Sequence, residues 1–283
     1  MLVSVKKLLE DAQEKGYALG AFNTSNLEVS QAIIKAAEVQ KSPVSIQVSE
    51  TTIDYAGFKP IVNLIKSLAE QSEIPLVLHL DHGRSYETAV RCIEANFSSV
   101  MIDGSALPFE ENVKLTKRVV DYAHQQGVWV QGELGRIPKA EESSKSLVKI
   151  EKTSPGEAKK FVQLTKVDAL AIAIGNVHGV HKKGRPRLDF DRLKKIHQLV
   201  KAPLVLHGGS GISEQDIKKA ISLGITKINI DTEIRIAFTG ALEKLFKKGI
   251  DTVDPRKILA LARQAVQKKV EEKIKIFGSA GKV

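Results

Sequence analysis

The feature that most constrains the fold of this chain is an alternation between short apolar runs and longer segments with helical spacing. The short runs are rich in β-branched residues and bounded by turn residues, and several are continuously apolar. Such strands are typical of parallel sheets covered on both faces. Eight strands are predicted, at Ala18–Phe22, Val44–Val48, Leu76–Leu80, Ser99–Ile102, Val128–Glu133, Ala169–Ile174, Leu204–His207 and Lys227–Ile230.

Each strand is followed by a segment whose apolar residues recur every three or four positions, as in an amphipathic helix. Ser154 before Pro155 predicts a capped helix start, and Ser213 followed by Asp216 predicts another. The predicted helices cover Asn26–Gln40, Lys59–Ser72, Ser85–Ala95, Phe109–Gln126, Pro155–Lys166, Asp189–Val200, Ser213–Leu223 and Asp231–Phe246.

Eight strand-then-helix units predict an α/β fold, a (β/α)8 TIM barrel, although an open doubly wound sheet shows the same alternation. An extra N-terminal helix is predicted at Ser4–Lys15 and a C-terminal helical extension at Pro255–Phe277. The least regular segment, Gly135–Thr153, is expected to form a mobile loop after the fifth strand. Because no linker-like stretch interrupts the 283 residues, we expect a single domain over residues 1–283.

Composition excludes several classes of protein. Charged residues make up 27% and hydrophobic residues 42%, which argues against disorder and low-complexity architectures. The single cysteine, Cys92, excludes an intramolecular disulfide and favours a cytoplasmic location. The longest strongly apolar stretch, Ala169–Ile174, is far below the roughly 18 residues of a membrane span, and Met1–Leu9 lacks the apolar core of a signal peptide. We therefore expect no membrane partner.

The net charge of +10, from 43 Lys and Arg against 33 Asp and Glu, favours anionic partners such as phosphates or nucleic acid. Nucleic-acid modules concentrate basic and aromatic side chains on one surface, whereas here lysines alternate with acids and aromatic residues make up only 5%. We therefore expect no nucleic-acid partner.

Histidines gather where the predicted strands end. His82, His178 and His207 follow three different strands, whose C-terminal ends open on one mouth of a barrel. Three neutral imidazoles with an open fourth position are typical of catalytic zinc, although a single such histidine is more often structural. His79 is the weaker candidate because strand alternation puts it on the same side as Asp81 but lower in the barrel.

Two turns predict a phosphate site. Gly208-Gly209-Ser210-Gly211 and Asn229-Ile230-Asp231-Thr232 each precede a predicted helix, where free backbone N–H groups favour an anion. A glycine-rich turn alone more often only reverses the chain. Its location favours phosphate, because the loops after strands seven and eight are the recurrent phosphate site of barrel enzymes.

These motifs in this order resemble the class II, metal-dependent fructose-bisphosphate aldolases, in the branch that includes tagatose-bisphosphate aldolases. The resemblance covers essentially the entire chain. It is carried by Gly20–Asn23, Ser42–Val44, Leu78–Gly83, Ser99–Ser105, Pro108–Asn112, Gly132–Gly135, Gly175–Gly179, Leu204–Gly211, Lys227–Ile230 and Asp254–Arg256.

The resemblance implies reversible cleavage of fructose 1,6-bisphosphate to dihydroxyacetone phosphate and glyceraldehyde 3-phosphate through a zinc-stabilised enediolate. It implies that Asp81 is the general acid/base and that Zn²⁺ is held by His82, His178 and His207. It further implies a second or displaced metal position at Asp103 and Glu133, as in some members.

The resemblance also implies the residues that contact substrate, with a monovalent cation, Na⁺ or K⁺, at the phosphate loop. Asp231 is expected to orient a substrate hydroxyl or to cap the helix that follows. Arg256 would reach the second phosphate from a neighbouring subunit of a homodimer or homotetramer. For Arg256 and for Lys182, a helix-capping or surface-charge role is the alternative. The implied contacts are Asn23, Ser49, Gly179, Lys182, Gly208, Gly209, Ser210, Asn229, Ile230, Asp231, Thr232 and Arg256.

The loop after strand five departs from the family pattern, since Arg136–Ser143 keeps two acids but loses the usual glycines. Glu142, narrowly ahead of Glu141, is expected to handle the C1 proton, and an exposed loop without a catalytic role is the alternative. Three functions stay open at this point: the fructose-bisphosphate reaction, the same reaction on tagatose 1,6-bisphosphate or another phosphorylated ketose, and a non-catalytic sugar-phosphate-binding subunit.

Overall fold

The strands close into a parallel barrel in chain order in the computed structural model, which describes residues 1–138, 151–179, 187–249 and 252–283. The closing pair is β1 with β8, in which Gly20 lies opposite Ile228. This closure confirms the TIM barrel and excludes the open doubly wound sheet. The strands are β1 Leu19–Asn23, β2 Val44–Ser49, β3 Leu76–Gly83, β4 Ser99–Ile102, β5 Trp129–Leu134, β6 Ala169–Ile172, β7 Leu204–Leu206 and β8 Ile225–Ile230.

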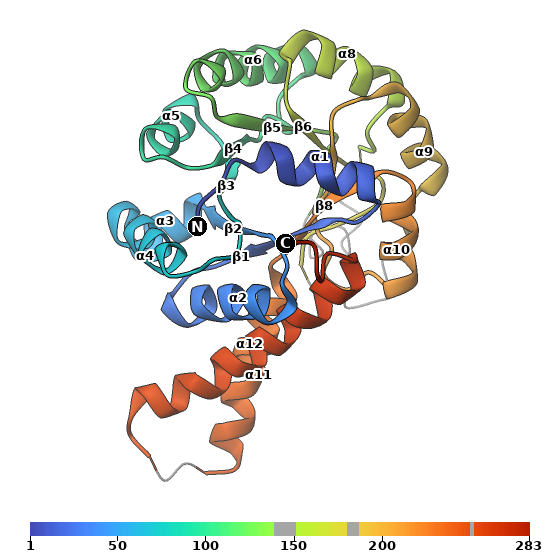
Figure 1. The fold of residues 1–283 in the computed structure, drawn as a ribbon. Coiled ribbons are helices and arrows are strands. Elements are labelled where there is room, and N and C mark those ends of the chain that lie inside the picture. The colour runs from blue at the N-terminus through green and yellow to red at the C-terminus, as the bar shows by residue number, and fades with distance from the viewer. Residues whose placement is uncertain (139–150, 180–186, 250–251) are drawn as a thin grey trace.

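Helices surround the barrel, as Figure 1 shows. One of them, α3, was not predicted, and the others lie within two residues of the predicted bounds. Ser213 accepts a hydrogen bond from the Asp216 N–H at 3.1 Å, as expected of a cap. Ser154 is the N-cap residue of α8 and Pro155 its first residue, as predicted, but the Ser154 side chain makes no capping hydrogen bond. The helices are α1 Val5–Lys15, α2 Leu27–Gln40, α3 Glu50–Ala56, α4 Phe58–Glu70, α5 Tyr86–Glu94, α6 Phe109–Gln125, α8 Pro155–Thr165, α9 Phe190–Leu199, α10 Glu214–Ser222, α11 Thr232–Lys247 and α12 Pro255–Phe277.

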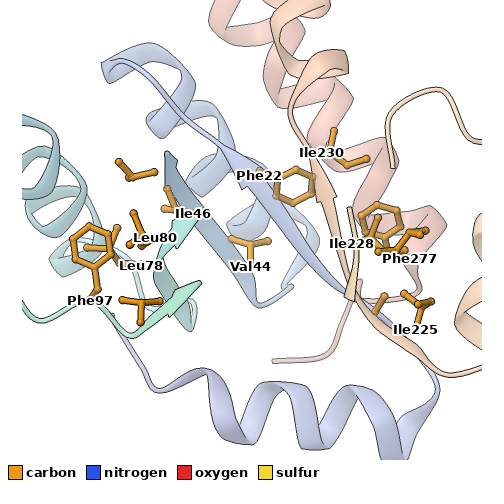
Figure 2. Close-up of a cluster of buried hydrophobic side chains, with 14 of the residues drawn as sticks. Phe22, Val44, Ile46, Leu78, Leu80, Phe97, Ile225, Ile228, Ile230 and Phe277 are labelled. Atoms are coloured by element: carbon orange, nitrogen blue, oxygen red, sulfur yellow. The ribbon is translucent and has the colours of Figure 1, made fainter. Parts of the chain in front are cut away.

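Most even-numbered strand residues point outward, into an apolar layer between the sheet and the helices. Figure 2 shows part of this layer, with Phe22, Ile46 and Leu80 on three adjacent strands. Phe22 stacks on Phe277 with ring centroids 6.5 Å apart, which fixes the end of α12 against the barrel. Most odd-numbered strand residues point into the barrel, so their chemistry decides what the interior can do.

Helix α1 lies across one end of the barrel (Figure 1). Its Val5, Leu8 and Leu9 pack on apolar residues from several strands, including Leu19 and Val77. This closes the N-terminal end of the barrel and leaves the opposite end for polar side chains.

Helices α11 and α12 form an arm, and the end of α11 and the start of α12 lie well away from the barrel (Figure 1). Large apolar side chains stay exposed on the arm, among them Ile236, Phe246 and Val253. In the part of the chain that the structure describes, no helix is long and apolar enough to span a membrane.

Candidate active site

Polar side chains fill the C-terminal half of the barrel interior. Asp81 and Asn229 come from odd positions of β3 and β8, and Glu133 and Gln131 from odd positions of β5. All four are buried. Because apolar residues occupy the outer face of the same strands, strand alternation alone turns these groups toward a common centre.

A local distortion of β3 brings His82 into the same centre as Asp81. Consecutive strand residues normally point to opposite faces, but the pairing of β3 with β4 shifts register between Leu80 and Gly83. His82 has a φ of 51°, a left-handed conformation that is uncommon for histidine and recurs at functional sites. The carboxylate and the imidazole therefore share one mouth.

The three predicted histidines meet there. One ligand atom from each of His82, His178 and His207 lies within 4.8 Å of the others. The Nε2 of His82 and the Nδ1 of His207 face each other at 3.0 Å. The Nδ1 of His82 lies 2.7 Å from Asp103 Oδ2, a contact that orients the ring as carboxylates do for metal-bound histidines.

The electrostatics of this cluster favour a positive charge. Burial opposes a charged imidazole at His82, but the neighbouring carboxylates, led by Asp81, outweigh it and raise the pKa of His82 to about 10. Burial also opposes ionisation of Asp103, yet His82 lowers the Asp103 pKa to about 2. Burial lowers the pKa of His207 well below its usual range, and the adjacent imidazoles lower it further. His207 is thus a neutral imidazole, the form that binds metals.

A second group of possible ligands shares His82 with Asp103 and Glu133, again with ligand atoms within 4.8 Å. Glu133 Oε2 lies 4.0 Å from His82 Nδ1 and 3.9 Å from His207 Nδ1. This buried oxygen has no hydrogen-bond partner among the described residues. Burial, followed by repulsion from Asp103, raises the pKa of Glu133 to about 8. An unpaired oxygen beside facing imidazoles fits a site for a divalent cation.

Asp81 lies beside the histidine cluster, held by two amides. Asn23 Nδ2 donates to Asp81 Oδ2 at 2.7 Å, and Asn229 Nδ2 donates to Asp81 Oδ1 at 3.2 Å. Both oxygens are thus fixed by neutral donors from β1 and β8. His79 lies deeper, with Nδ1 2.7 Å from Ser99 Oγ, and is not part of the candidate metal groups found among the described residues.

The glycine turn after β7 packs tightly against the loop after β6. Gly208 has a φ of 63°, and a Cβ there would collide with the Val177 carbonyl oxygen, so only glycine fits. The expectation of free N–H groups is only partly met. The Gly209 N–H donates to Asn229 O at 3.1 Å and the Gly211 N–H to a carboxylate oxygen of Glu233 at 3.0 Å. Within the described chain, the Gly208 and Ser210 N–H groups donate to no backbone acceptor.

The remaining expected residues fall into different settings. Gly179 has a φ of 100°, a left-handed conformation that favours glycine. Ser49 accepts from the Thr52 N–H at 3.3 Å and caps α3. The Ile230 side chain is fully buried, which leaves only its backbone for a ligand, and Thr232 begins α11. Glu142, its alternative Glu141, and Lys182 lie outside the described residues.

Two expected residues lie away from their anticipated contacts. Asp231 precedes α11 but makes no side-chain cap, because its carboxylate instead accepts from Arg235 Nε at 2.8 Å. The capping role predicted for it is therefore wrong. Arg256 is the second residue of α12, has a side chain that is 90% exposed, and pairs with Asp254.

Sequence analysis missed two buried residues beneath the cluster. Lys227 Nζ donates to Gln131 Oε1 at 2.9 Å, and Gln131 Nε2 lies 2.8 Å from His207 Nε2. Both residues occupy odd positions of predicted strands, so the alternation of side chains along a strand could have predicted that they point into the barrel.

A closed parallel barrel whose mouth gathers three imidazoles, an adjoining carboxylate and a glycine turn before a helix defines a barrel enzyme with a candidate metal site. The sequence family described as fructose-bisphosphate aldolase class-II matches residues 3–282. A fructose-bisphosphate aldolase of Geobacillus stearothermophilus is 48% identical over 99% of this chain and 98% of its own length. One of Thermus caldophilus is 44% identical, with 100% of both chains covered.

The crystal structure of the YdjI aldolase from Escherichia coli K12 matches the fold with a TM-score of 0.89 and 38% sequence identity, over 100% of this chain and 99% of that chain. The chain therefore belongs to the class II fructose-bisphosphate aldolase family. This confirms the family resemblance of the motifs.

Proposed function

We propose that this chain catalyses the reversible aldol cleavage of fructose 1,6-bisphosphate to dihydroxyacetone phosphate and glyceraldehyde 3-phosphate. The observation that carries the proposal is the Asp81 carboxylate, fixed by Asn23 and Asn229 beside three facing imidazoles. Family membership and relatives that carry this activity in their names support the same reaction.

His82, His178 and His207 would hold Zn²⁺, whose Lewis acidity favours the negative charge that develops on the ketose oxygens. Two properties of the chain support this ligand set: the neutral state of His207 and the hydrogen bond that orients His82. His82, Asp103 and Glu133 would form a second or displaced metal position. Their ligand atoms lie within 4.8 Å of one another, and Glu133 Oε2 has no hydrogen-bond partner among the described residues.

Asp81 would accept the proton of the C4 hydroxyl as the C3–C4 bond breaks, so that C4 becomes the aldehyde carbon. In the condensation direction Asp81 returns that proton to the aldehyde oxygen. The two amides that hold its oxygens prevent the carboxylate from turning toward the histidines. Glu142 would exchange the proton at C1 of dihydroxyacetone phosphate.

The phosphate of the dihydroxyacetone half would lie between the two turns after β7 and β8. Among the described residues, the N–H groups of Gly208 and Ser210 meet no backbone acceptor, and this supports the placement. Gly179, Gly209 and the turn Asn229–Thr232 complete the contact, with Na⁺ or K⁺ beside the loop. Asn23, Ser49 and Asp231 would contact the substrate hydroxyls, and Asp231 would do so with its carboxylate. Ile230 would contact the substrate through its backbone.

The second phosphate would be bound by Lys182 and by Arg256 of a neighbouring subunit, in a homodimer or homotetramer. The exposure of Arg256 and its place on the projecting arm support a contact between subunits. We propose that residues 1–283 act as one cytoplasmic catalytic domain.

The decisive test is the ratio of kcat/KM for fructose 1,6-bisphosphate to that for tagatose 1,6-bisphosphate, its C4 epimer, with purified zinc-loaded protein. We expect the fructose substrate to be preferred. A large preference for the tagatose epimer would reject the proposed substrate while keeping the aldol reaction.

Treatment with EDTA separates an enzyme from a sugar-phosphate-binding subunit. We expect aldol cleavage to be lost with the metal and to return when zinc is added. A protein that binds zinc and phosphate without turnover would instead be a binding subunit.

A further inference from the structure

A largely buried ion pair lies next to the turn Gly208–Gly211 after β7, which we call the phosphate loop. Lys273 of α12 contacts Glu233 of α11, with Nζ 2.5 Å from Oε2. The side chain of Lys273 is only 7% exposed and that of Glu233 is 22% exposed. The other carboxylate oxygen of Glu233 accepts the hydrogen bond from the Gly211 N–H at 3.0 Å. One carboxylate thus joins the loop to α12.

A second contact ties Glu233 to the same loop. The Glu233 backbone N–H donates to Ser210 Oγ at 3.2 Å. The serine oxygen therefore caps the first turn of α11, a position where Asp231 provides no side-chain cap. Because Ser210 Oγ accepts this bond, its own hydrogen is free to point toward a ligand. Glu233 fixes two consecutive residues of the turn.

The placement of a carboxylate here poses an electrostatic difficulty. A negative charge within hydrogen-bonding distance of the loop repels the phosphate dianion that the loop would bind, and burial strengthens the repulsion. A positive charge close to the carboxylate offsets this repulsion. Lys273 supplies that charge from the side of Glu233 that faces α12.

The position of Lys273 is itself fixed by the barrel. One turn further along α12, Phe277 stacks on Phe22 of β1 at 6.5 Å, a contact that Figure 2 shows. The neighbouring Ile274 is fully buried. The packing of α12 against the barrel therefore keeps the Lys273 ammonium group close to Glu233.

We propose that Glu233 and Lys273 are positioning residues for the phosphate loop: Glu233 fixes Ser210 and Gly211, and Lys273 cancels the charge of Glu233 so that a phosphate can bind beside it. This inference rests on the proposed function, because it takes the turn after β7 as the phosphate site. It assigns to α12 a part in substrate binding that is separate from Arg256.

The test measures the dissociation constant of inorganic phosphate by titration calorimetry on zinc-loaded protein. Lys273→Met leaves the carboxylate uncompensated, and we expect phosphate to bind about tenfold more weakly. Glu233→Gln keeps an oxygen for Gly211 but removes the negative charge, and we expect binding about threefold tighter. The double variant lacks both charges and should return to within about threefold of the wild type.

Lys269→Met is the matched control, because Lys269 lies on the same helix and pairs with Glu272 at 2.7 Å with a 30% exposed side chain. Its phosphate affinity should equal that of the wild type. In steady-state kinetics Lys273→Met should raise KM for the bisphosphate more than it lowers kcat, because the loop contacts phosphate and not the reacting carbons.

Opposite signs for the two single variants distinguish charge compensation from ordinary packing, which predicts weaker binding in both. Weaker or unchanged phosphate binding in Glu233→Gln overturns the inference, even if Lys273→Met fails to fold. Failure of the double variant to recover affinity also overturns it. If the wild type cleaves the bisphosphate, but Glu233→Gln does not bind phosphate more tightly and Lys273→Met more weakly than the wild type, only the inference fails. If the wild type neither binds phosphate nor cleaves, the proposed function fails as well.

Discussion

Lys227 offers a quantitative test of how the barrel interior treats charge. It is buried beneath the histidine cluster, and its hydrogen-bond partner is the neutral amide of Gln131. Burial lowers the pKa of Lys227 from 10.5 to about 7, with Asp81 opposing the change. The unfolded chain therefore binds this proton more tightly than the folded barrel does, so the unfolded state holds more protons between those two values.

The stability contributed by this group rises with pH, because the unfolding free energy increases wherever the unfolded state binds more protons. The lowering of the Lys227 pKa, about 3.5 pH units, changes the pH-dependent part of the unfolding free energy by about 5 kcal/mol in total, at about 1.4 kcal/mol per unit. Between pH 7 and pH 10 the expected gain is about 4 kcal/mol. Well below pH 7 both states are protonated, and this contribution becomes constant.

Lys227→Met removes the titrating group and keeps most of the side-chain volume. Loss of the donor to Gln131 Oε1 costs about 1–3 kcal/mol, but this cost does not change with pH. We therefore expect the unfolding free energy of wild type minus variant, from urea denaturation, to rise by about 4 kcal/mol from pH 7 to pH 10. Lys201→Met, at an exposed lysine, controls for the loss of a lysine as such. If the wild-type-minus-variant difference in unfolding free energy does not change between pH 7 and pH 10, the lowered pKa of Lys227 is refuted.

Three further substitutions test the site. Asp81→Ala should lower kcat by about 10²–10⁴-fold with near-normal zinc content by metal analysis, and stoichiometric zinc loss would contradict its role. His207→Ala should lower both zinc affinity and activity, since only three protein ligands are proposed, and wild-type affinity in a chelator competition would require other ligands. Gly208→Ala should lower Tm by several degrees and weaken phosphate binding, because its Cβ meets the Val177 carbonyl. An unchanged Tm would show that the loop relaxes freely.

The barrel was predictable because each strand is apolar on the face it presents to the helices, and that pattern is local in sequence. The strand ends were less predictable, because they depend on partners in other strands. β3 runs on to Gly83 since Ile102 of β4 pairs with it there, whereas β7 ends at Leu206. Helix α3 was missed because it has only seven residues and buries only Thr52, too little for an apolar period.

The ion pair behind the turn after β7 could not be predicted from the sequence, for a different reason. Glu233 and Lys273 stand forty positions apart on two helices whose crossing is set by packing, and each alone is typical of a solvated helix face. Gln131 and Lys227, by contrast, occupy inward positions of predicted strands. A charged residue at an inward position of a barrel strand is a signal that sequence analysis can use.

At Asp81 and His82 the alternation of side chains between the two faces of a strand breaks down, and this break marks the candidate metal site. Strict period-two geometry would place one side chain in the barrel and send the other toward the helices, so the two adjacent residues could not serve one reaction. The chain resolves this conflict with a register shift in β3 and a left-handed residue at His82. Such a conformation persists only where surrounding contacts hold it, here the Asp103 carboxylate at 2.7 Å. Asp103→Ala should therefore weaken zinc binding by about 10–100-fold even if it is not itself a ligand, because His82 would lose the contact that keeps its ring in the mouth.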